Sequence, residues 1–188
     1  MPNWCSNKMV IRGGKEDIQA VLDFISPDPS KDEFDFEKVI PVPPALTEVE
    51  SNNNAYPMEY FESLRRALCG YPSCYEFCVS EWGTKWIPDD VTIDRPSGVV
   101  YFSTAWCPPL GIFLELSRKF PSVVLFTRSF EGGCGICQEE SYSNGSTVFT
   151  NYPQYHSKEW YEIMFDAEGG EDLYHYDSEL GTYVENDD

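Results

Sequence analysis

The sequence predicts an α+β fold, in which an antiparallel sheet carries helices on one face. The spacing of apolar residues predicts elements in the order strand, helix, inserted region, strand, strand, helix, strand. The two middle strands, at 87–94 and 99–103, are separated by a turn at 95–98 that contains Pro96 and Gly98, residues typical of a β-hairpin. The hydrophobic fraction of 41% is enough to fill a core, which argues against global disorder.

The first strand and the first helix occupy the N-terminal 25 residues. Residues 3–12 alternate loosely between apolar and polar side chains, which indicates a strand that ends at Gly13. Residues 15–25 place apolar side chains at helical spacing, and the proline-containing sequence that follows predicts the end of the helix. The apolar face of this helix consists of Ile18, Val21, Leu22 and Ile25.

An insertion at about 28–80 separates this helix from the central hairpin. It is longer than an ordinary loop, so we expect it to carry helices of its own. Prolines near the end of segment 34–44 predict an extended chain laid across the core, since proline disrupts helix interiors and central strands. Residues 51–54 read as a loop and 57–68 as a helix, whereas 73–80 fits either a helix or a strand. The expected anchors of the extended segment are Phe34, Phe36 and Ile40.

The second half of the core follows the hairpin. Pro108 and Pro109 suit the first turn of a helix that runs to about residue 120, and 123–130 is a dense apolar strand. Two further strands, at 135–142 and 147–151, are expected as an added hairpin. The order of elements is that of the split βαβ, or ferredoxin-like, fold. The predicted division is a ferredoxin-like domain at 1–150 and an acidic, tyrosine-rich extension at 151–188.

The extension has an unusual composition. Residues 157–165 suggest a short helix capped by Ser157. From Asp166 to the end there are nine carboxylates, interleaved with tyrosines, and no Lys or Arg. One interpretation is a partly ordered, solvated tail; the other is an aromatic-acidic surface that imitates the charge of DNA or RNA. The acidic residues proposed to face a partner are Glu168, Glu171, Asp172, Asp177 and Glu179.

The net charge of −19 and the sequence pI near 4.3 bear on the class of partner. Direct binding to nucleic acid is disfavoured, because phosphates are neutralised by Lys and Arg. The charge favours a protein partner with a basic surface, or serves solubility alone. The N-terminus resembles no signal peptide, no apolar run is long enough to span a bilayer, and the seven cysteines suit a reducing compartment. We therefore expect a cytoplasmic protein of a bacterial host cell, without membrane association.

Tryptophans flank the central hairpin on both sides. If its strands pair, the segments before and after them lie side by side, and Trp82, Trp86 and Trp106 gather at one end of the sheet with Lys85. Such a group could stack a base or hold a cation, or it could close the hydrophobic core. The candidate ligand- or partner-binding residues are Trp82, Thr84, Lys85, Trp86, Thr104, Trp106, Asn3 and Trp4.

Catalytic and metal chemistry have weaker support. Two close cysteine pairs differ in spacing, and isolated thiols are the simpler interpretation, so neither a metal nor a cofactor is expected. His156 and His175 have no candidate nucleophile near them in sequence, and no phosphate-binding loop is present. No catalytic residues are therefore assigned, and we do not expect an enzyme. The weak candidates for a zinc site are Cys74, Cys78, Cys134 and Cys137.

Four blocks of sequence carry a family resemblance. They lie at 1–7 (MPNWCSN), 34–43 (FDFEKVIPVP), 82–86 (WGTKW) and 104–109 (TAWCPP). Together they resemble the YubB-type ferredoxin-like family of plasmids and bacteriophages, over most of the first 150 residues. The resemblance implies a ferredoxin-like core and an origin on a mobile element, and it brings no catalytic residues. Cys107 stands where the pattern leads us to expect Ser, and the acidic tail lies outside the resemblance.

Charge and resemblance together suggest a function. We expect a non-enzymatic protein encoded by a phage or plasmid, which inhibits a host nucleic-acid-handling or defence protein by occupying its basic surface. The alternative is a small-ligand protein that binds a nucleotide, or a signal derived from one, at the tryptophan cluster.

Overall fold

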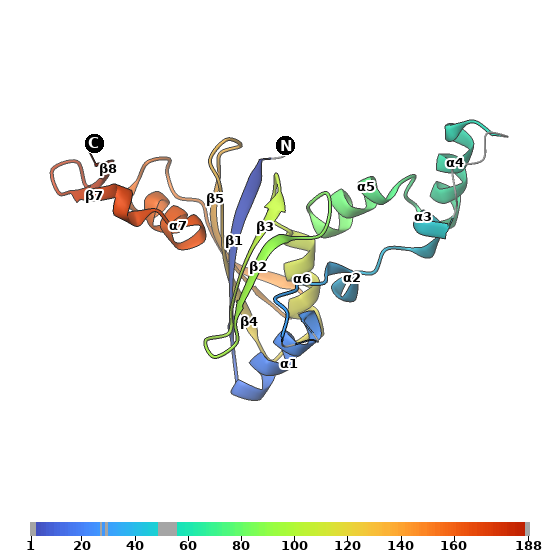
Figure 1. The fold of residues 1–188 in the computed structure, drawn as a ribbon, viewed down its shortest axis with the longest axis horizontal. Helices are drawn as coiled ribbons and strands as arrows, with labels where there is room; N and C mark the ends of the chain where they lie inside the picture. Colours follow the sequence, from blue (N-terminus) through green and yellow to red (C-terminus); the bar gives the residue numbers. More distant parts are fainter. Residues whose placement is uncertain (1–2, 27, 29, 49–55, 187–188) are drawn as a thin grey trace.

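A computed structural model of the chain describes residues 3–26, 28, 30–48 and 56–186. Six strands of the described residues form one antiparallel sheet in the spatial order β2-β3-β1-β4-β5-β6 (Figure 1). Their bounds are β1 (Trp4–Arg12), β2 (Asp89–Asp94), β3 (Val99–Ala105), β4 (Val124–Glu131), β5 (Ile136–Ser143) and β6 (Ser146–Asn151). The order of the first four is that of a ferredoxin-like sheet, so the predicted fold class is confirmed.

Strand β1 shows how the buried face of the sheet is specified. Its side chains alternate, so that the odd-numbered residues from Cys5 to Ile11 are buried and the even-numbered ones are partly or fully exposed. Met9 pairs with Val100 of β3 on one side and with Thr127 of β4 on the other. Because directly opposed residues share a face, this register carries the buried face across the middle of the sheet.

Two helices cover that face, as the sequence predicts. Helix α1 (Lys15–Ile25) has the predicted bounds, and α6 (Leu110–Lys119) begins after the two prolines (Figure 1). At the C-terminal end of α6, Arg118 and Lys119 form ion pairs with Glu115 at 3.0 and 3.6 Å. The two helices bury Val21, Leu22, Ile25, Ile112, Phe113 and Leu116.

The insertion is helical, as predicted, but segment 34–44 is not extended throughout. A short helix forms within it because the Asp35 carboxylate accepts a hydrogen bond from the Glu37 backbone N–H at 3.0 Å. Pro44 then opens the next helix, a position that tolerates proline. The loop expected at 51–54 lies outside the described residues. The helices are α2 (Phe36–Val39), α3 (Pro44–Glu48), α4 (Met58–Cys69) and α5 (Cys74–Phe77).

Segment 73–80, for which a helix and a strand were both open, is helical. Helix α5 continues into a π-helical turn, Cys78–Trp82, which ends at Gly83 with a left-handed φ of 89°. Helix α4 stands far from the sheet (Figure 1) and buries only Phe61. No helix in the described part of the chain is long and apolar enough to cross a membrane.

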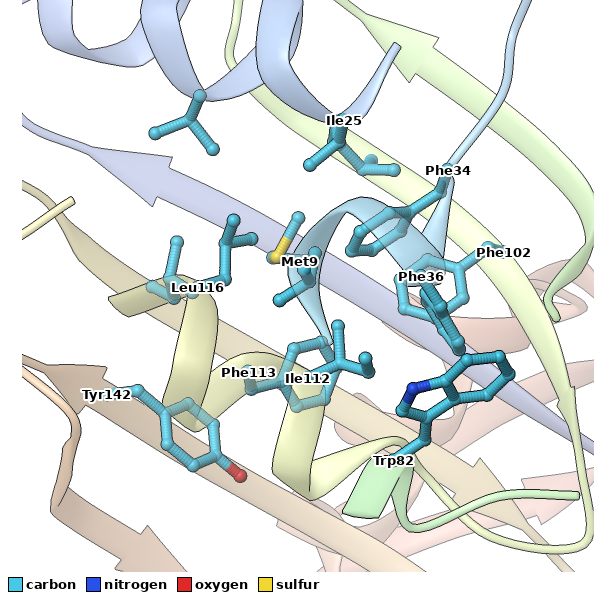
Figure 2. Packing of buried hydrophobic residues seen from close by; sticks show 14 of the residues in the cluster. Met9, Ile25, Phe34, Phe36, Trp82, Phe102, Ile112, Phe113, Leu116 and Tyr142 are labelled. Atoms are coloured by element: carbon cyan, nitrogen blue, oxygen red, sulfur yellow. The ribbon is translucent and has the colours of Figure 1, made fainter. Parts of the chain in front are cut away.

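The main hydrophobic core lies between the sheet, its two helices and the start of the insertion (Figure 2). Phe36 is fully buried, and its ring centroid lies 4.9 Å from that of Phe34 and 5.7 Å from that of Trp82. Phe34 in turn contacts Phe102 of β3 at 5.1 Å. Phe34 and Phe36 therefore anchor the insertion to the sheet, as the sequence predicts.

The C-terminal extension is more ordered than the solvated tail that one interpretation of the sequence expects. Helix α7 (Lys158–Glu168) is followed by strands β7 (Tyr174–Asp177) and β8 (Thr182–Glu185), which form a hairpin. The unit covers part of the sheet face opposite α1 and α6 (Figure 1). It encloses a second hydrophobic cluster whose buried members are Phe130, Cys137, Trp160, Tyr161, Ile163 and Met164.

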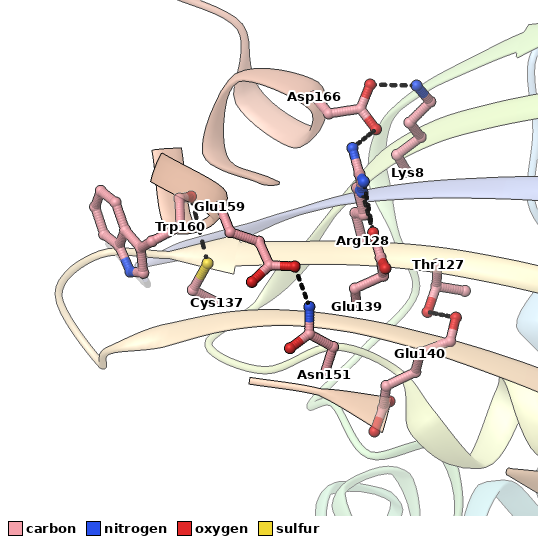
Figure 3. Close-up of polar contacts among 10 residues, drawn as sticks. All are labelled: Lys8, Thr127, Arg128, Cys137, Glu139, Glu140, Asn151, Glu159, Trp160 and Asp166. Atoms are coloured by element: carbon pink, nitrogen blue, oxygen red, sulfur yellow. Dashed lines mark hydrogen bonds and ion pairs between the residues drawn. The ribbon is translucent and has the colours of Figure 1, made fainter. Parts of the chain in front are cut away.

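Ion pairs connect α7 to the sheet (Figure 3). Asp166 contacts Lys8 of β1 and also pairs with Arg128 of β4 at 3.1 Å. Arg128 bridges to Glu139 of β5, and Asn151 of β6 donates to Glu159 of α7 at 2.9 Å. Apolar burial and these polar contacts together account for the order of the extension, although its composition suggests a solvated segment.

Candidate functional site

The tryptophans of the predicted cluster have different roles. Trp82 is buried in the main core, where its indole Nε1 donates to the Ile40 carbonyl at 2.9 Å. Its ring also packs edge-on against Phe36 and Phe77. For Trp82, then, the interpretation as part of the core is correct, although the residue also lines a surface groove.

That groove is the best candidate for a ligand site. It has a volume of about 360 Å³, and its wall is mostly apolar. The half-exposed indole of Trp86 and the ring of Tyr75 lie in its wall together with Lys85. Trp82 also lines the groove, and the remaining residues come from the insertion and from the segment before β2, namely Glu37, Val42, Thr47, Cys74, Cys78 and Ile87.

Lys85 connects the groove to the third tryptophan. Its ammonium lies 5.0 Å from the ring centroid of Trp106 and 5.9 Å from that of Tyr75, both within cation–π range. Within the described residues, no carboxylate forms an ion pair with Lys85. The groove thus combines aromatic surface with one cation, Lys85, and one carboxylate, Glu37. The side of the groove at Lys85 suits the anionic part of a planar ligand. Sequence reasoning missed Tyr75, because segment 73–80 fits either a helix or a strand and its side chains cannot be assigned to a face from the pattern alone.

The two predicted threonines are buried and serve the backbone. Thr84 Oγ1 donates to the Ala105 carbonyl at 3.0 Å, which holds the segment before β2 against the end of β3. Thr104 Oγ1 donates to the Cys107 carbonyl at 2.8 Å and accepts from Asn7 Nδ2 at 2.9 Å. Because these bonds occupy both hydroxyl groups, neither threonine is available to a ligand in the groove.

Asn3 and Trp4 also lie outside the groove. The Asn3 carbonyl accepts a hydrogen bond from the Trp106 backbone N–H at 3.0 Å, so Asn3 helps to hold Trp106 in its left-handed conformation, with a φ of 70°. Trp4 is one of the even-numbered residues of β1, which face away from α1 and α6. Of the eight predicted residues, the groove brings together Trp82, Lys85 and Trp86, and Lys85 reaches Trp106.

The cysteine pairs do not assemble. Among the described residues, no three His, Cys, Asp or Glu side chains are placed to hold a metal ion. Cys74 and Cys78 line the groove, whereas Cys137 is buried beneath α7, where its thiol donates to the Trp160 carbonyl at 3.6 Å. Burial raises the pKa of Cys78 to about 11 and that of Cys137 to about 12. The neighbouring Glu131 carboxylate raises the pKa of Cys134, so these three thiols are protonated at neutral pH.

Glu131 gives a pH-dependent prediction. Burial raises the pKa of its carboxyl, but hydrogen bonds from Cys134 and the Gly133 backbone N–H outweigh burial, and the pKa falls below the ordinary value of 4.5. A carboxyl whose pKa is lower in the folded state than in the unfolded state stabilises the fold at pH values above its ordinary pKa. This stabilisation is lost as the pH falls through the pKa of the folded state. We expect Glu131→Gln to lower stability at neutral pH and to flatten its decline below pH 4.5, measured by urea unfolding across pH. Glu62→Gln, at an exposed position, is the control and should leave the profile unchanged.

The acidic residues fall into two groups on the C-terminal unit. Glu168 ends α7, and Glu171 and Asp172 begin the short 3-10 helix after it. Asp177 has a structural role, because its carboxylate accepts from the backbone N–H groups of Glu179 at 2.8 Å and Leu180 at 3.1 Å. The side chains exposed beside them include large apolar ones, namely Leu173, Tyr176 and Leu180.

A comparison with protein families decides the relationship. Residues 81–177, just over half of the chain, match the family described as the ferredoxin-like domain in Api92-like protein. The chain belongs to the Api92-like family. The match to the Api92-like domain begins at the end of the insertion and ends with β7. It omits β1, which lies between β3 and β4. The matched residues therefore cannot form this sheet without the N-terminal strand.

A solved structure of an Api92 protein also aligns with the chain. The crystal structure of protein api92 from Yersinia pseudotuberculosis has 11% sequence identity and a TM-score of 0.49. The alignment covers 82% of this chain and 99% of that one. No curated protein matches the chain by sequence.

Proposed function

We propose that this member of the Api92-like family is a non-enzymatic acidic binding protein that occupies the basic surface of a host protein. The observation that carries the proposal is the surface of the C-terminal unit. From Asp166 onwards the chain has nine carboxylates and no Lys or Arg. Those at 166–185 lie on a folded unit, which consists of the end of α7, a short 3-10 helix and the β7–β8 hairpin. A net charge of −19 adds a long-range field that attracts cationic surfaces.

The geometry of this unit supports binding rather than solubility alone. Glu171, Asp172 and Glu179 are exposed, and Leu173, Tyr176 and Leu180 are exposed beside them. Apolar and aromatic side chains contribute the desolvated centre of an interface, and surrounding charges set the partner and the rate of encounter. Solubility alone would need the carboxylates but not these apolar neighbours.

The class of host protein follows from its charge. A surface that binds nucleic acid is rich in Lys and Arg, and a folded acidic surface competes with the nucleic acid for it. The resemblance to the YubB-type family supports an origin on a phage or plasmid, and counter-defence in the bacterial cytoplasm would suit such an origin. We therefore propose a host nucleic-acid-handling or defence protein as the partner.

The test compares charge removed at this surface with charge removed elsewhere. We expect the triple variant Glu171→Gln, Asp172→Asn and Glu179→Gln to lose most of the partner captured from host lysate by the wild type. The matched control removes three exposed carboxylates from the insertion, with Glu48→Gln, Glu62→Gln and Glu76→Gln, and should retain the partner. Capture should fall as salt is raised. Equal loss in both variants, or capture that is insensitive to salt, would contradict the proposal.

A second function is supported by the groove at Trp86. Its aromatic wall and Lys85 suit a nucleotide or a nucleotide-derived signal, with the base against an indole and the phosphate near the ammonium. We expect tryptophan fluorescence to change on titration with one member of a nucleotide panel. Lys85→Met should abolish the change, whereas Lys15→Met, on α1, should preserve it. A panel without any response would remove this function and leave the first untouched.

A further inference from the structure

The two edges of the six-stranded sheet differ in chemistry. At one edge, β2 carries Asp89, Asp90 and Asp94, and its pairing is broken by a register shift. Inserted charges and irregular pairing are devices that keep an edge strand from pairing with another chain. At the other edge, β6 has the sequence Ser-Thr-Val-Phe-Thr-Asn and no charged residue. It pairs with β5 on one side, and within the described residues no other strand pairs with it.

The stretches of chain on either side of β6 share this lack of charge. Asp, Glu, Lys and Arg make up 24% of the chain, yet none occurs between residues 141 and 157. This stretch includes the end of β5, all of β6 and the segment that leads to α7. A second copy of the chain, also at −19, therefore meets no carboxylate that β6 itself contributes. The Glu159 carboxylate of α7 lies at the end of β6, where Asn151 donates a hydrogen bond to it at 2.9 Å.

The exposed side chains of β6 are those expected of a strand that pairs. Val148 and Phe149 are 59% and 46% exposed. The β5–β6 ladder contains a register shift, in which Tyr142 pairs with Thr147 and Ser141 pairs with Phe149. Val148 is therefore the additional residue of a β-bulge on β6. Thr147 and Thr150 lie opposite Tyr142 and Glu140, so both threonines point to the face that carries α6.

The backbone of β6 offers matching groups. The hairpin turns at Asn144 and Gly145, so Ser143 and Ser146 form the hydrogen-bonded pair that closes it. Antiparallel ladders alternate between pairs that exchange hydrogen bonds and pairs whose N–H and C=O groups point away. Thr147 and Thr150 belong to pairs that do not exchange hydrogen bonds with β5, so their backbone N–H and C=O groups point to the unpaired edge of β6.

We propose that β6 pairs in antiparallel fashion with β6 of a second copy of this chain, across a two-fold axis. The sequence has a register that suits this pairing. When the axis passes between Val148 and Phe149, each Thr147 faces Thr150 of the other copy, and each Val148 faces Phe149. Thr–Thr and aromatic–β-branched pairs stabilise antiparallel ladders, and the outward backbone groups of the threonines meet one another. The pairing is self-complementary and therefore closes as a dimer.

The charge of the two copies gives the dimer a salt dependence of its own. The two negatively charged copies repel each other at low salt, and added salt screens that repulsion. The dissociation constant of the dimer should therefore fall as the salt concentration rises. The partner complex under the proposed function should weaken over the same range. The dimer is measured on the protein alone, so its failure and the failure of that function are distinguishable.

Light scattering coupled to size-exclusion chromatography tests the dimer across protein and salt concentration. We expect the wild type to reach twice the chain mass of 21.5 kDa. Thr147→Glu with Thr150→Glu should give a folded monomer, because the register sets carboxylates against carboxylates. Thr147→Lys with Thr150→Glu should restore the dimer, because each new cation then faces a new carboxylate.

The matched control adds two carboxylates away from this edge, with Thr92→Glu and Ser178→Glu, and should remain dimeric. Circular dichroism checks that each variant is folded. A wild type that is monomeric at every salt concentration, or a double-glutamate variant that still dimerises, would overturn the proposal. Open-ended assemblies larger than a dimer would overturn it as well. A monomeric lysine–glutamate variant would overturn the register.

Discussion

Gly111→Ala is expected to destabilise the protein by about 3 kcal/mol or more, the upper range for overpacking a buried contact. A Cβ atom at this position would lie 1.8 Å from the carbonyl oxygen of Glu81. The obstacle is backbone rather than a flexible side chain, so it can be relieved only by moving α6 away from the π-helical turn. Trp82 and Ile112, on either side of the contact, are buried and oppose that movement.

The sign of this effect makes the experiment decisive. Alanine favours a helix over glycine by up to about 1 kcal/mol, so local propensity alone predicts that Gly111→Ala is stabilising. Urea unfolding, followed by far-UV circular dichroism, gives the free energy of unfolding for both proteins. Gly132→Ala is the matched control, since a Cβ there meets only the Phe130 ring at an ordinary 3.5 Å. A stabilised or unchanged Gly111 variant would show that α6 and the insertion do not approach this closely.

Phe36→Ala should cost about 4 kcal/mol, within the range for deleting a buried aromatic ring. The ring is fully buried and contacts Phe34, Trp82 and Phe102. Its removal opens a cavity at the point where the insertion joins the sheet. We therefore expect the loss to appear in the unfolding of the whole domain, measured by chemical denaturation, together with a red-shifted emission from Trp82.

An exposed aromatic residue of the same insertion provides the comparison. Tyr75 lies in the wall of the groove and is half-exposed, so Tyr75→Ala should change the free energy of unfolding by no more than about 0.5 kcal/mol. Equal losses in the two variants would mean that the insertion is not anchored through Phe36. A small loss for Phe36→Ala, with unchanged tryptophan emission, would lead to the same conclusion.

The elements that the sequence predicts well are those defined by local periodicity. Helix α1 has the predicted bounds, and β4, predicted at 123–130, spans Val124–Glu131. A periodic apolar pattern reports only which side of an element is buried, and that information is local. The helical turn at α2 was missed although a local signal was available, since Asp35 followed by Glu37 is a helix cap within a proline-rich stretch.

The C-terminal unit and the groove depend on contacts between residues that are far apart in the sequence. Composition and local pattern therefore predict their structure less well. Helix α7 is held by Lys8 and Arg128, which no local pattern links to Asp166. Trp82 and Trp86 are four positions apart, yet one completes the core and the other lines the groove. That difference depends on Gly83, whose left-handed backbone ends the π-helical turn. Thr84 and Thr104 were predicted at a site because the sequence does not reveal which hydroxyl groups the backbone already engages.

The separation of the two hydrophobic clusters has a consequence for how the molecule opens. The sheet lies between them, with the main cluster under α1 and α6 and the smaller one under α7. The smaller cluster can lose its cover while the opposite face stays packed, so we expect the extension to open as a unit at a lower free energy than the main core. Amide protons of α7 and of the β7–β8 hairpin should exchange with deuterated solvent sooner than those of β1. A binding surface on this unit would thus sit on a part of the molecule that rearranges at a lower free energy than the main core does.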